Sequence, residues 1–139
     1  MKPLVIPVFA ALLCFSTFAT AGGEVLSSDI NRDGTPDSWT HLNNGRVEKQ
    51  EIDMNFDGHI DTVYIYEFNQ KVREEILDTD YNGRMDNWRF YENGELVQDH
   101  IDSDGDGRVD MWFYIDRSMI YKLEKDTNGN GKPDVTNNY

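Results

Sequence analysis

The sequence predicts an all-β protein, built from tandem β-hairpin repeats of about 24 residues that form a curved antiparallel meander. Three observations predict this fold class. An aspartate-rich pattern recurs five times at nearly constant spacing, short runs of alternating apolar and polar residues lie between the copies, and turn-forming pairs interrupt those runs. A fixed period of roughly 20–50 residues is typical of repeat architectures, and alternation with a period of two is typical of strands.

The recurring pattern is clearest at residues 102–110, which read Asp-Ser-Asp-Gly-Asp-Gly-Arg-Val-Asp. Oxygen-bearing side chains occupy positions 1, 3, 5 and 9 of this loop, and Gly107 at position 6 permits a sharp turn. Ca²⁺ takes about six to eight oxygen ligands at roughly 2.3–2.6 Å, and alternate residues of a tight loop can all point at one centre. Arg108 at position 7 would offer only its backbone carbonyl. The pattern therefore predicts a calcium-binding loop.

The five copies start at residues 29, 53, 78, 102 and 126, in steps of 24, 25, 24 and 24 residues. The predicted side-chain ligands are Asp29, Asn31, Asp33, Asp37, Asp53, Asn55, Asp57, Asp61, Asp78, Asp80, Asn82, Asp86, Asp102, Asp104, Asp106, Asp110, Asp126, Asn128, Asn130 and Asp134. The predicted ligands through the backbone carbonyl alone are Thr35, His59, Arg84, Arg108 and Lys132. One such copy is equally well explained as a turn in which Asp and Asn bond to their own backbone. Five copies in phase favour calcium over turns without metal.

Each loop is followed by a short alternating run, a turn and a second run, which predicts one hairpin per repeat. Asn-Gly between β-rich runs is the strongest short-range hairpin signal, and it occurs at Asn44-Gly45 and Asn93-Gly94. Residues 111–115 and 119–123 form the corresponding runs of the fourth repeat, around 116–118. The second repeat has one extra residue near Glu67-Phe68, which suggests a bulge or a longer turn.

Alignment of the repeats places similar residues in columns. The second residue after each loop is Trp39, Val63, Trp88 or Trp112, and the fourth is His41, Ile65, Phe90 or Tyr114. The return runs carry the columns Val47, Val72, Leu96, Ile120 and Ile52, Leu77, Ile101. Because side chains alternate along a strand, the first two columns should share one face of the sheet.

The fifth copy continues only through residues 135–139 and is interpreted as a half-repeat that forms a polar end cap. We therefore expect one β-repeat domain over residues 22–139. Propeller blades fit less well, because a blade needs about 40 residues or more.

Residues 1–21 are typical of a signal peptide, with Lys2, an apolar run over residues 4–15, and an Ala-x-Ala pattern that predicts cleavage after Ala21. Export to the periplasm or the medium follows, without membrane attachment of the mature chain. A lipid anchor at Cys14 would need small residues before it, but leucines stand there. An uncleaved anchor is also disfavoured, because the apolar run is barely long enough to span a bilayer. The mature chain has no cysteine for a disulfide.

The charge is strongly acidic, with a net −13 for the whole chain and −14 without residues 1–21. Fifteen of the 26 acidic residues lie in the five loops, and five Ca²⁺ ions would reduce the net charge to about −4. Without metal the loops would crowd like charges together, so we expect a loose or unfolded metal-free form. Nucleic acid is not expected as a partner, since phosphate binding needs Lys and Arg. A surface kept acidic for solubility is the alternative, but it does not explain the regular spacing.

The loops resemble the D-x-D-x-D-G-x-x-D loops of integrin-α-type FG-GAP repeats and thrombospondin type 3 repeats, and the first half of an EF-hand. The EF-hand resemblance ends at position 12, where a bidentate Glu belongs and where this chain has Thr40, Tyr64, Arg89, Phe113 and Asn137. The integrin-like resemblance implies bidentate binding by the position-9 aspartates; water is the other way to complete the shell. Dockerins share the spacing, but their loops lead into helices. The hairpins, such as residues 88–94, resemble MORN repeats and choline-binding repeats.

These features predict a secreted calcium-binding repeat protein, a structural scaffold or binding module stabilised by about five Ca²⁺ ions. The alternative is a module that binds a glycan or a choline-type ligand through the Trp and Tyr column; another protein is also a possible partner. We favour the interpretation that this column is simply the hydrophobic column of the sheet. An enzyme is not expected: the acids are accounted for as loop ligands, and the three histidines fall at unrelated repeat positions.

Overall fold

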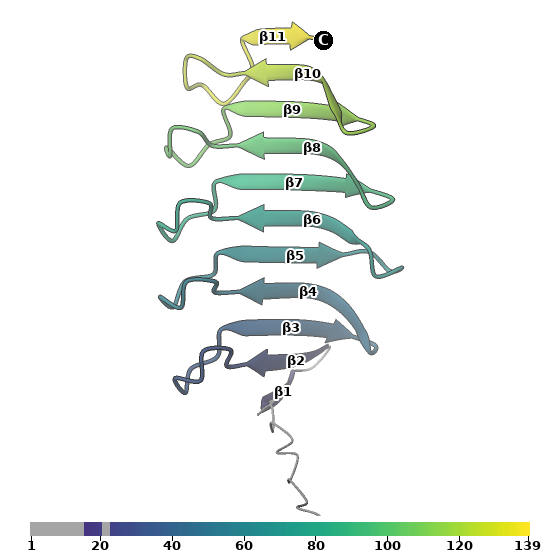
Figure 1. Ribbon diagram of the computed structural model, residues 1–139, viewed down its shortest axis with the longest axis vertical. Coiled ribbons are helices and arrows are strands. Elements are labelled where there is room, and N and C mark those ends of the chain that lie inside the picture. Colours follow the sequence, from purple (N-terminus) through teal and green to yellow (C-terminus); the bar gives the residue numbers. More distant parts are fainter. Residues whose placement is uncertain (1–15, 21–22) are drawn as a thin grey trace, which may run out of the picture.

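The computed structural model describes residues 16–20 and 23–139, which form one antiparallel sheet of eleven strands in sequence order (Figure 1). The described residues contain strands and loops but no helix. This confirms the predicted fold class. The strands are β1 (Ser16–Thr20), β2 (Gly23–Ser28), β3 (Ser38–Asn43), β4 (Arg46–Ile52), β5 (Thr62–Tyr66), β6 (Val72–Leu77), β7 (Asn87–Glu92), β8 (Glu95–Ile101), β9 (Met111–Asp116), β10 (Met119–Lys125) and β11 (Val135–Asn138).

The hairpins β3–β4, β5–β6, β7–β8 and β9–β10 are the four complete repeats. Asn44-Gly45 and Asn93-Gly94 form two-residue turns in which all four φ angles are positive. Such turns match the right-handed twist of the strands, which is why Asn-Gly is favoured there. The extra residue of the second repeat lies in a longer turn, closed by a hydrogen bond of 2.8 Å from the Glu67 amide to the Lys71 carbonyl.

Each of these four hairpins also has a β-bulge at the same place. The register shifts once in each pair, which leaves one residue of each return strand without a direct partner. These residues are Glu48, Arg73, Val97 and Tyr121. The sequence suggested a bulge or a longer turn for the second repeat, and its extra residue lies in a longer turn; the bulges shared by the four hairpins were not predicted.

The strand register confirms the predicted columns. Trp39, Val63, Trp88 and Trp112 lie in one row across the sheet, separated by residues of the return strands between them. A second row on the same side of the sheet contains His41, Ile65, Phe90 and Tyr114. We call the side that carries both rows the tryptophan face. The interposed residues of the first row are Glu51, Ile76, His100 and Glu124.

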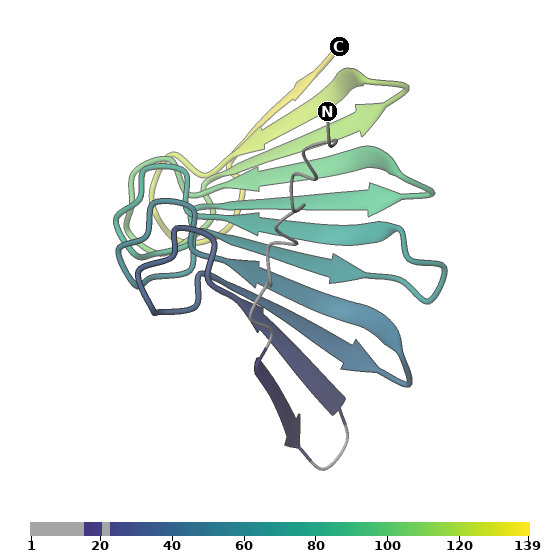
Figure 2. The same ribbon diagram turned by 60° about the horizontal axis from the view of Figure 1, so that its bottom comes forward.

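The sheet is a single layer. Among residues 23–139, Leu123 is the one apolar side chain that is buried, and the other buried residues are Ser27, Asp37, Ser38, Asp53, Asp61, Thr62, Asp78, Asn87, Asp102 and Asp126. Most of these polar residues lie in or beside the loops, which gather along one edge of the sheet while the hairpin ends fan out opposite (Figure 2). Burial is therefore concentrated at carboxylates of the loop edge.

Strand β1 belongs to the segment that the sequence assigns to a signal peptide. It pairs antiparallel with β2, with Ser16 opposite Ser27 and Thr20 opposite Gly23. The predicted signal-peptide features at Lys2, Cys14 and Ala21 lie outside the described residues.

Candidate metal centre

The five aspartate-rich loops connect each return strand to the next outgoing strand: loop 1 (29–37), loop 2 (53–61), loop 3 (78–86), loop 4 (102–110) and loop 5 (126–134). All five lie along the same edge of the sheet (Figures 1 and 2). This follows from the hairpin repeat, because every complete hairpin returns the chain to the edge from which it started.

Backbone hydrogen bonds continue the sheet into the loops. The position-9 amide donates to the carbonyl of the residue that precedes the loop, as from Asp86 to Leu77 at 2.8 Å. The position-1 amide donates to the position-9 carbonyl of the preceding loop, as from Asp102 to Asp86 at 2.9 Å. The same second bond joins loops 1 and 2, loops 2 and 3, and loops 4 and 5. Successive loops are thus fixed to one another as well as to the strands.

The position-1 carboxylate organises the turn of its own loop. One oxygen of Asp78 accepts from the amide of Gly83 at 2.7 Å, and one oxygen of Asp102 accepts from Gly107 at 2.8 Å. Both glycines have positive φ angles, 83° and 90°, which other residues adopt only with strain. The predicted role of the position-6 glycine is confirmed by this geometry.

The position-9 carboxylate closes the loop from the other side. Oδ2 of Asp61 accepts from the amides of Met54 at 2.6 Å and Asn55 at 3.1 Å. In loops 3, 4 and 5 a hydroxyl at position 2 also donates to this carboxylate, as from Thr79 to Asp86 at 2.9 Å. Among the described residues, Oδ1 of Asp61 is the one buried side-chain oxygen or nitrogen without a hydrogen-bond partner.

The position-5 carboxylates of loops 1 and 2, Asp33 and Asp57, are exposed, and their hydrogen bonds favour the ionised form. Hydrogen bonds from the hydroxyl and amide of Thr35 lower the pKa of Asp33, and the amide of His59 lowers the pKa of Asp57. Donors that bind the charged form favour it. These side chains are therefore available as anionic oxygen ligands near neutral pH.

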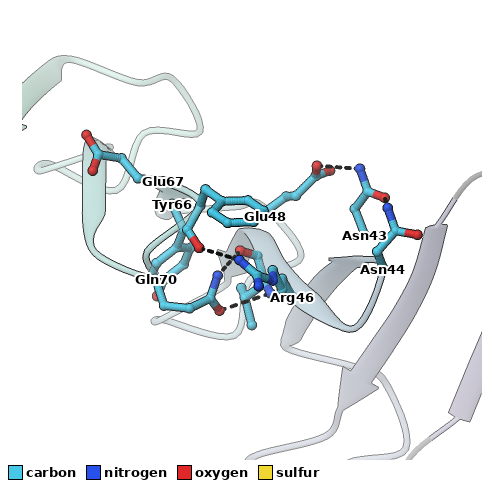
Figure 3. Close-up of a pocket in the computed structure, with 9 residues that line it drawn as sticks. Asn43, Asn44, Arg46, Glu48, Tyr66, Glu67 and Gln70 are labelled. Carbon is cyan, nitrogen blue, oxygen red and sulfur yellow. Dashed lines mark hydrogen bonds between the residues drawn. The ribbon is translucent and has the colours of Figure 1, made fainter.

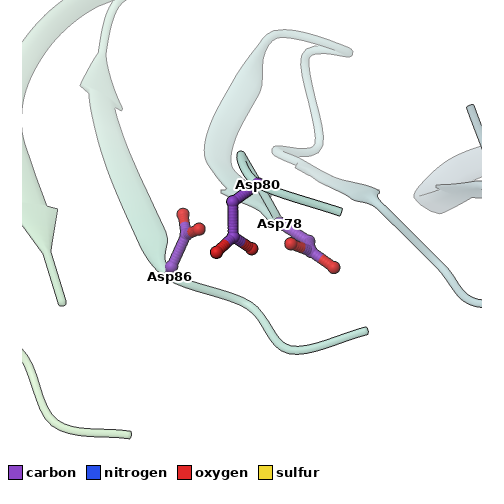
Figure 4. Close-up of side chains that lie close together, drawn as sticks. All are labelled: Asp78, Asp80 and Asp86. Carbon is purple, nitrogen blue, oxygen red and sulfur yellow. The ribbon is translucent and has the colours of Figure 1, made fainter. Parts of the chain in front are cut away.

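Carboxylates converge in two adjacent loops. In loop 3 the side chains of Asp78, Asp80 and Asp86 offer oxygens that lie within 4.8 Å of one another (Figure 4). In loop 4 the same holds for Asp102, Asp104 and Asp106, while the fourth aspartate, Asp110, lies outside the group. These two groups are able to hold a metal ion. In the described part of loops 1, 2 and 5, where asparagine stands at position 3, no group of three carboxylates meets this distance.

The side chains at position 7 extend toward the following loop. Arg84 donates to the carbonyl of Gly105 at 3.1 Å, and Arg108 donates to the carbonyl of Gly129 at 3.0 Å. The ring of His59 lies beside Gly83, 3.3 Å from where a Cβ atom on that glycine would stand. That the position-7 carbonyls bind metal stays a prediction.

The sequence did not lead us to expect left-handed backbone at position 4 of the loops. Arg32, Phe56 and Tyr81 have φ angles of 66°, 64° and 60°, and Gly105 and Gly129 occupy the same position in loops 4 and 5. Left-handed backbone is uncommon for residues other than glycine. Gly105 and Gly129 were the sequence features that could have predicted a positive φ angle at this position.

The opposite edge of the sheet has a shallow pocket of about 310 Å³ between the first two hairpins (Figure 3). Arg46 donates to the carbonyl of Phe68 at 3.0 Å and lies 3.6 Å from the centre of its ring. The side-chain amide of Gln70 bonds to both the amide and the carbonyl of Val47, each at 3.2 Å. These polar groups bond to one another across the pocket, and the bonds connect the first hairpin to the second.

The three histidines have separate surroundings. His41 on β3 lies 2.6 Å from Glu51, and His59 in loop 2 lies 3.0 Å from Asp57. His100 on β8 lies 3.0 Å from Gln98, and its burial lowers its pKa.

No family model, no curated protein and no solved structure matches this chain. In the described residues there is no helix long and apolar enough to cross a membrane.

Proposed function

We propose that this protein is a calcium-binding repeat protein whose loops hold metal ions that stabilise a single-layer sheet, so that the sheet serves as a scaffold or binding surface. The observation that carries the proposal is the convergence of carboxylates in loops 3 and 4. Such groups repel one another unless a cation lies between them.

The donor atoms favour calcium among the common metals. The loops offer carboxylate, amide and carbonyl oxygens, and hard cations such as Ca²⁺ prefer oxygen ligands. Mg²⁺ is smaller and needs near-ideal octahedral geometry, whereas Ca²⁺ accepts six to eight ligands in roughly the arrangement that a flexible loop provides. The unpartnered Oδ1 of Asp61 supports the extension to loop 2, because a buried carboxylate oxygen without a donor is destabilising.

The size of the effect suits a stabilising role. Extracellular modules bind Ca²⁺ with a Kd of about 10⁻⁴–10⁻³ M. At a free concentration about tenfold above Kd, each site stabilises the fold by roughly 1.4 kcal/mol. Five sites would contribute about 7 kcal/mol, which is comparable to the whole stability of a small domain. A chain with little apolar burial can depend on that contribution.

Isothermal titration of protein stripped with a chelator tests the proposal. We expect at least two bound Ca²⁺ ions per chain, held in loops 3 and 4, and up to five. The double variant Asp78→Asn and Asp102→Asn should lose the heat of those two sites. The control Asp116→Asn, which alters an exposed acid at the opposite edge of the sheet, should bind as the parent does. Fewer than two ions per chain would reject the proposal.

A second candidate function is supported by the tryptophan face. Trp39, Trp88 and Trp112 are half-buried and lie in one row on an open sheet, where aromatic rings can stack on a sugar or a quaternary amine. Tryptophan fluorescence at fixed calcium tests this candidate. A shift on adding oligosaccharide or choline supports ligand binding, and an unchanged spectrum supports a purely structural row. The proposed calcium-binding protein is exported and has no catalytic role.

A further inference from the structure

Without β1, the sheet would end at β2 on one side and at β11 on the other, and these two strands are halves of the same repeat. Each complete repeat has an outgoing strand after its loop and a return strand before the next loop. Strand β2 leads into loop 1 and is a return strand, whereas β11 follows loop 5 and is an outgoing strand. Between them lie four complete hairpins. An outgoing strand at one edge and a return strand at the other are complementary.

We propose that copies of this chain join head to tail, by pairing β11 of one copy with β2 of the next. The hairpin β3–β4 gives the register, because Ser38 lies opposite Ile52 and Thr40 opposite Gln50. Counting from the loops, Val135 then lies opposite Ser28 of the next copy, and Asn137 lies opposite Leu26 of the next copy. The junction becomes a fifth hairpin without its turn. The inference goes beyond metal binding and rests on backbone register.

The loops at such a junction also fit. In the chain, each position-1 amide from loop 2 onward donates to the position-9 carbonyl of the preceding loop. Asp29 opens loop 1 and Asp134 closes loop 5, so the same bond would form between the Asp29 amide and the Asp134 carbonyl of adjoining copies. Lys132 stands at position 7, where Arg84 and Arg108 donate to a carbonyl of the following loop. The equivalent acceptor for Lys132 is the Arg32 carbonyl of the next copy.

The edge strands lack the usual protection against pairing. Natural edge strands are blunted by charged residues, proline or bulges. Strand β11 has the sequence Val-Thr-Asn-Asn, with no charge and no proline, and its residues are exposed. Strand β2 carries a single charge, at Glu24. The polar side chains of β11 suit a solvent-facing cap, but they leave its outer backbone groups open to a new strand.

Strand β1 shows that the edge of β2 accepts an antiparallel partner. It pairs there with Ser16 opposite Ser27 and Phe18 opposite Val25. Because β1 lies within the segment that the sequence predicts to be removed, an unprocessed chain has this edge covered. Processing would open it, so assembly would follow export. The contact is heterologous and repeats from copy to copy, which generates a filament unless the array closes into a ring.

Disulfide trapping tests the register in the full chain. The starting variant carries Cys14→Ser, to remove the native thiol, and Thr17→Pro with Phe18→Pro, to release β1. Into it we place Leu26→Cys and Asn137→Cys, which face each other across the proposed junction. Within one copy these positions are nine strand spacings apart, roughly 43 Å, too far for a bond within the chain. The matched control is Val25→Cys with Asn137→Cys, whose side chains point to opposite faces.

After oxidation in calcium-containing buffer, the Leu26→Cys/Asn137→Cys variant should show a ladder of dimers, trimers and longer species on a non-reducing gel. The amount of cross-linked protein should be at least tenfold greater than for the control pair. Restoring Thr17 and Phe18 should suppress the ladder. Equal ladders from both pairs, or dimers alone, would overturn the head-to-tail register, because pairing of β2 with β2 stops at dimers. A ladder that is indifferent to β1 would overturn its masking role.

Sedimentation of the released chain without engineered cysteines provides a second measurement, in case a cysteine variant fails to fold. We expect the weight-average mass to rise continuously with concentration, whereas a concentration-independent monomer contradicts assembly. Circular dichroism of the same sample distinguishes the two proposals: a folded monomer that binds calcium rejects assembly and leaves the metal proposal intact.

Discussion

The amide of Asp102 donates a hydrogen bond of 2.9 Å to the carbonyl of Asp86, and this bond joins loop 4 to loop 3. Asp86 and Asp102 are also members of the two carboxylate groups that are able to hold a metal ion. The two groups are therefore connected through the backbone, and the bond from Arg84 to the Gly105 carbonyl is a second link between the same loops. The loop edge acts as a continuous structure, and several consequences can be measured.

Removal of the Asp102 side chain should destabilise the calcium-loaded fold. Its carboxylate is buried and accepts from the amides of Gly105 and Gly107, each at 2.8 Å. Asp102→Ala leaves these donors without their partner, so we expect a loss of about 1–3 kcal/mol in the free energy of unfolding. Urea unfolding of parent and variant at the same calcium concentration measures it. Asp116→Ala, at an exposed turn, should change the free energy by less than about 0.5 kcal/mol.

Charge at position 5 should set the affinity of individual loops. Loop 4 has Asp106 there and loop 5 has Asn130, and calcium affinity increases with the number of charged ligands. Loop 4 has four carboxylates and should bind calcium tightest, and loop 5 has two and should bind it weakest. Asp106→Asn should weaken the loop 4 site about tenfold, or about 1.4 kcal/mol, and Asn130→Asp should strengthen the loop 5 site by a similar factor. Calcium titration calorimetry of both variants measures this. Changes in the same direction would contradict the ranking of the loops by charge.

The turn of the β9–β10 hairpin should be improvable. Arg117 and Ser118 adopt φ angles of 47° and 62°, in the same turn position where Asn93-Gly94 stands in the preceding hairpin. Arg117→Asn with Ser118→Gly relieves this strain, and we expect a gain of about 1–2 kcal/mol by thermal unfolding. The reverse exchange, Asn93→Arg with Gly94→Ser, should cost about as much. Two exchanges of equal sign would show that left-handed strain does not decide the effect.

Alkaline pH should weaken the sheet through Tyr91. Burial and a hydrogen bond of 2.9 Å to Glu75 raise its pKa from 10.0 to about 12. Between pH 10 and 12 the folded chain keeps this proton while the unfolded chain releases it, so the free energy of unfolding falls as the pH rises. Tyr91→Phe should show a smaller decrease over this interval in urea unfolding. An equal slope in parent and variant would assign the decrease to other groups.

The strands and their faces were predictable from sequence because their signals are local. Asn-Gly at residues 44–45 and 93–94 fixes two turns, and alternation between Trp88 and Phe90 fixes a face. The constant spacing of the loops then predicts the order of the strands, since hairpins that follow one another in sequence pair with one another. The same local chemistry identified the carboxylates of loops 3 and 4.

Other features depend on contacts between repeats and left little trace in one repeat. The bulges at Glu48 and Val97 arise where the hairpin turn meets the twist of two strands. The bond from Arg84 to Gly105 requires the spacing of neighbouring loops, which the sequence alone does not give. The meander was predicted from its hairpins, since half-buried columns of Trp and Ile look the same whether or not a second layer covers them.

Thermal unfolding followed by far-ultraviolet circular dichroism, with calcium and then with chelator, tests the central claim most directly. If metal ions in the loops replace an apolar core, the melting temperature should be higher by tens of degrees with calcium, and the chelated chain should lose most of its β signal. Equal melting temperatures and an unchanged β spectrum in chelator would contradict the claim.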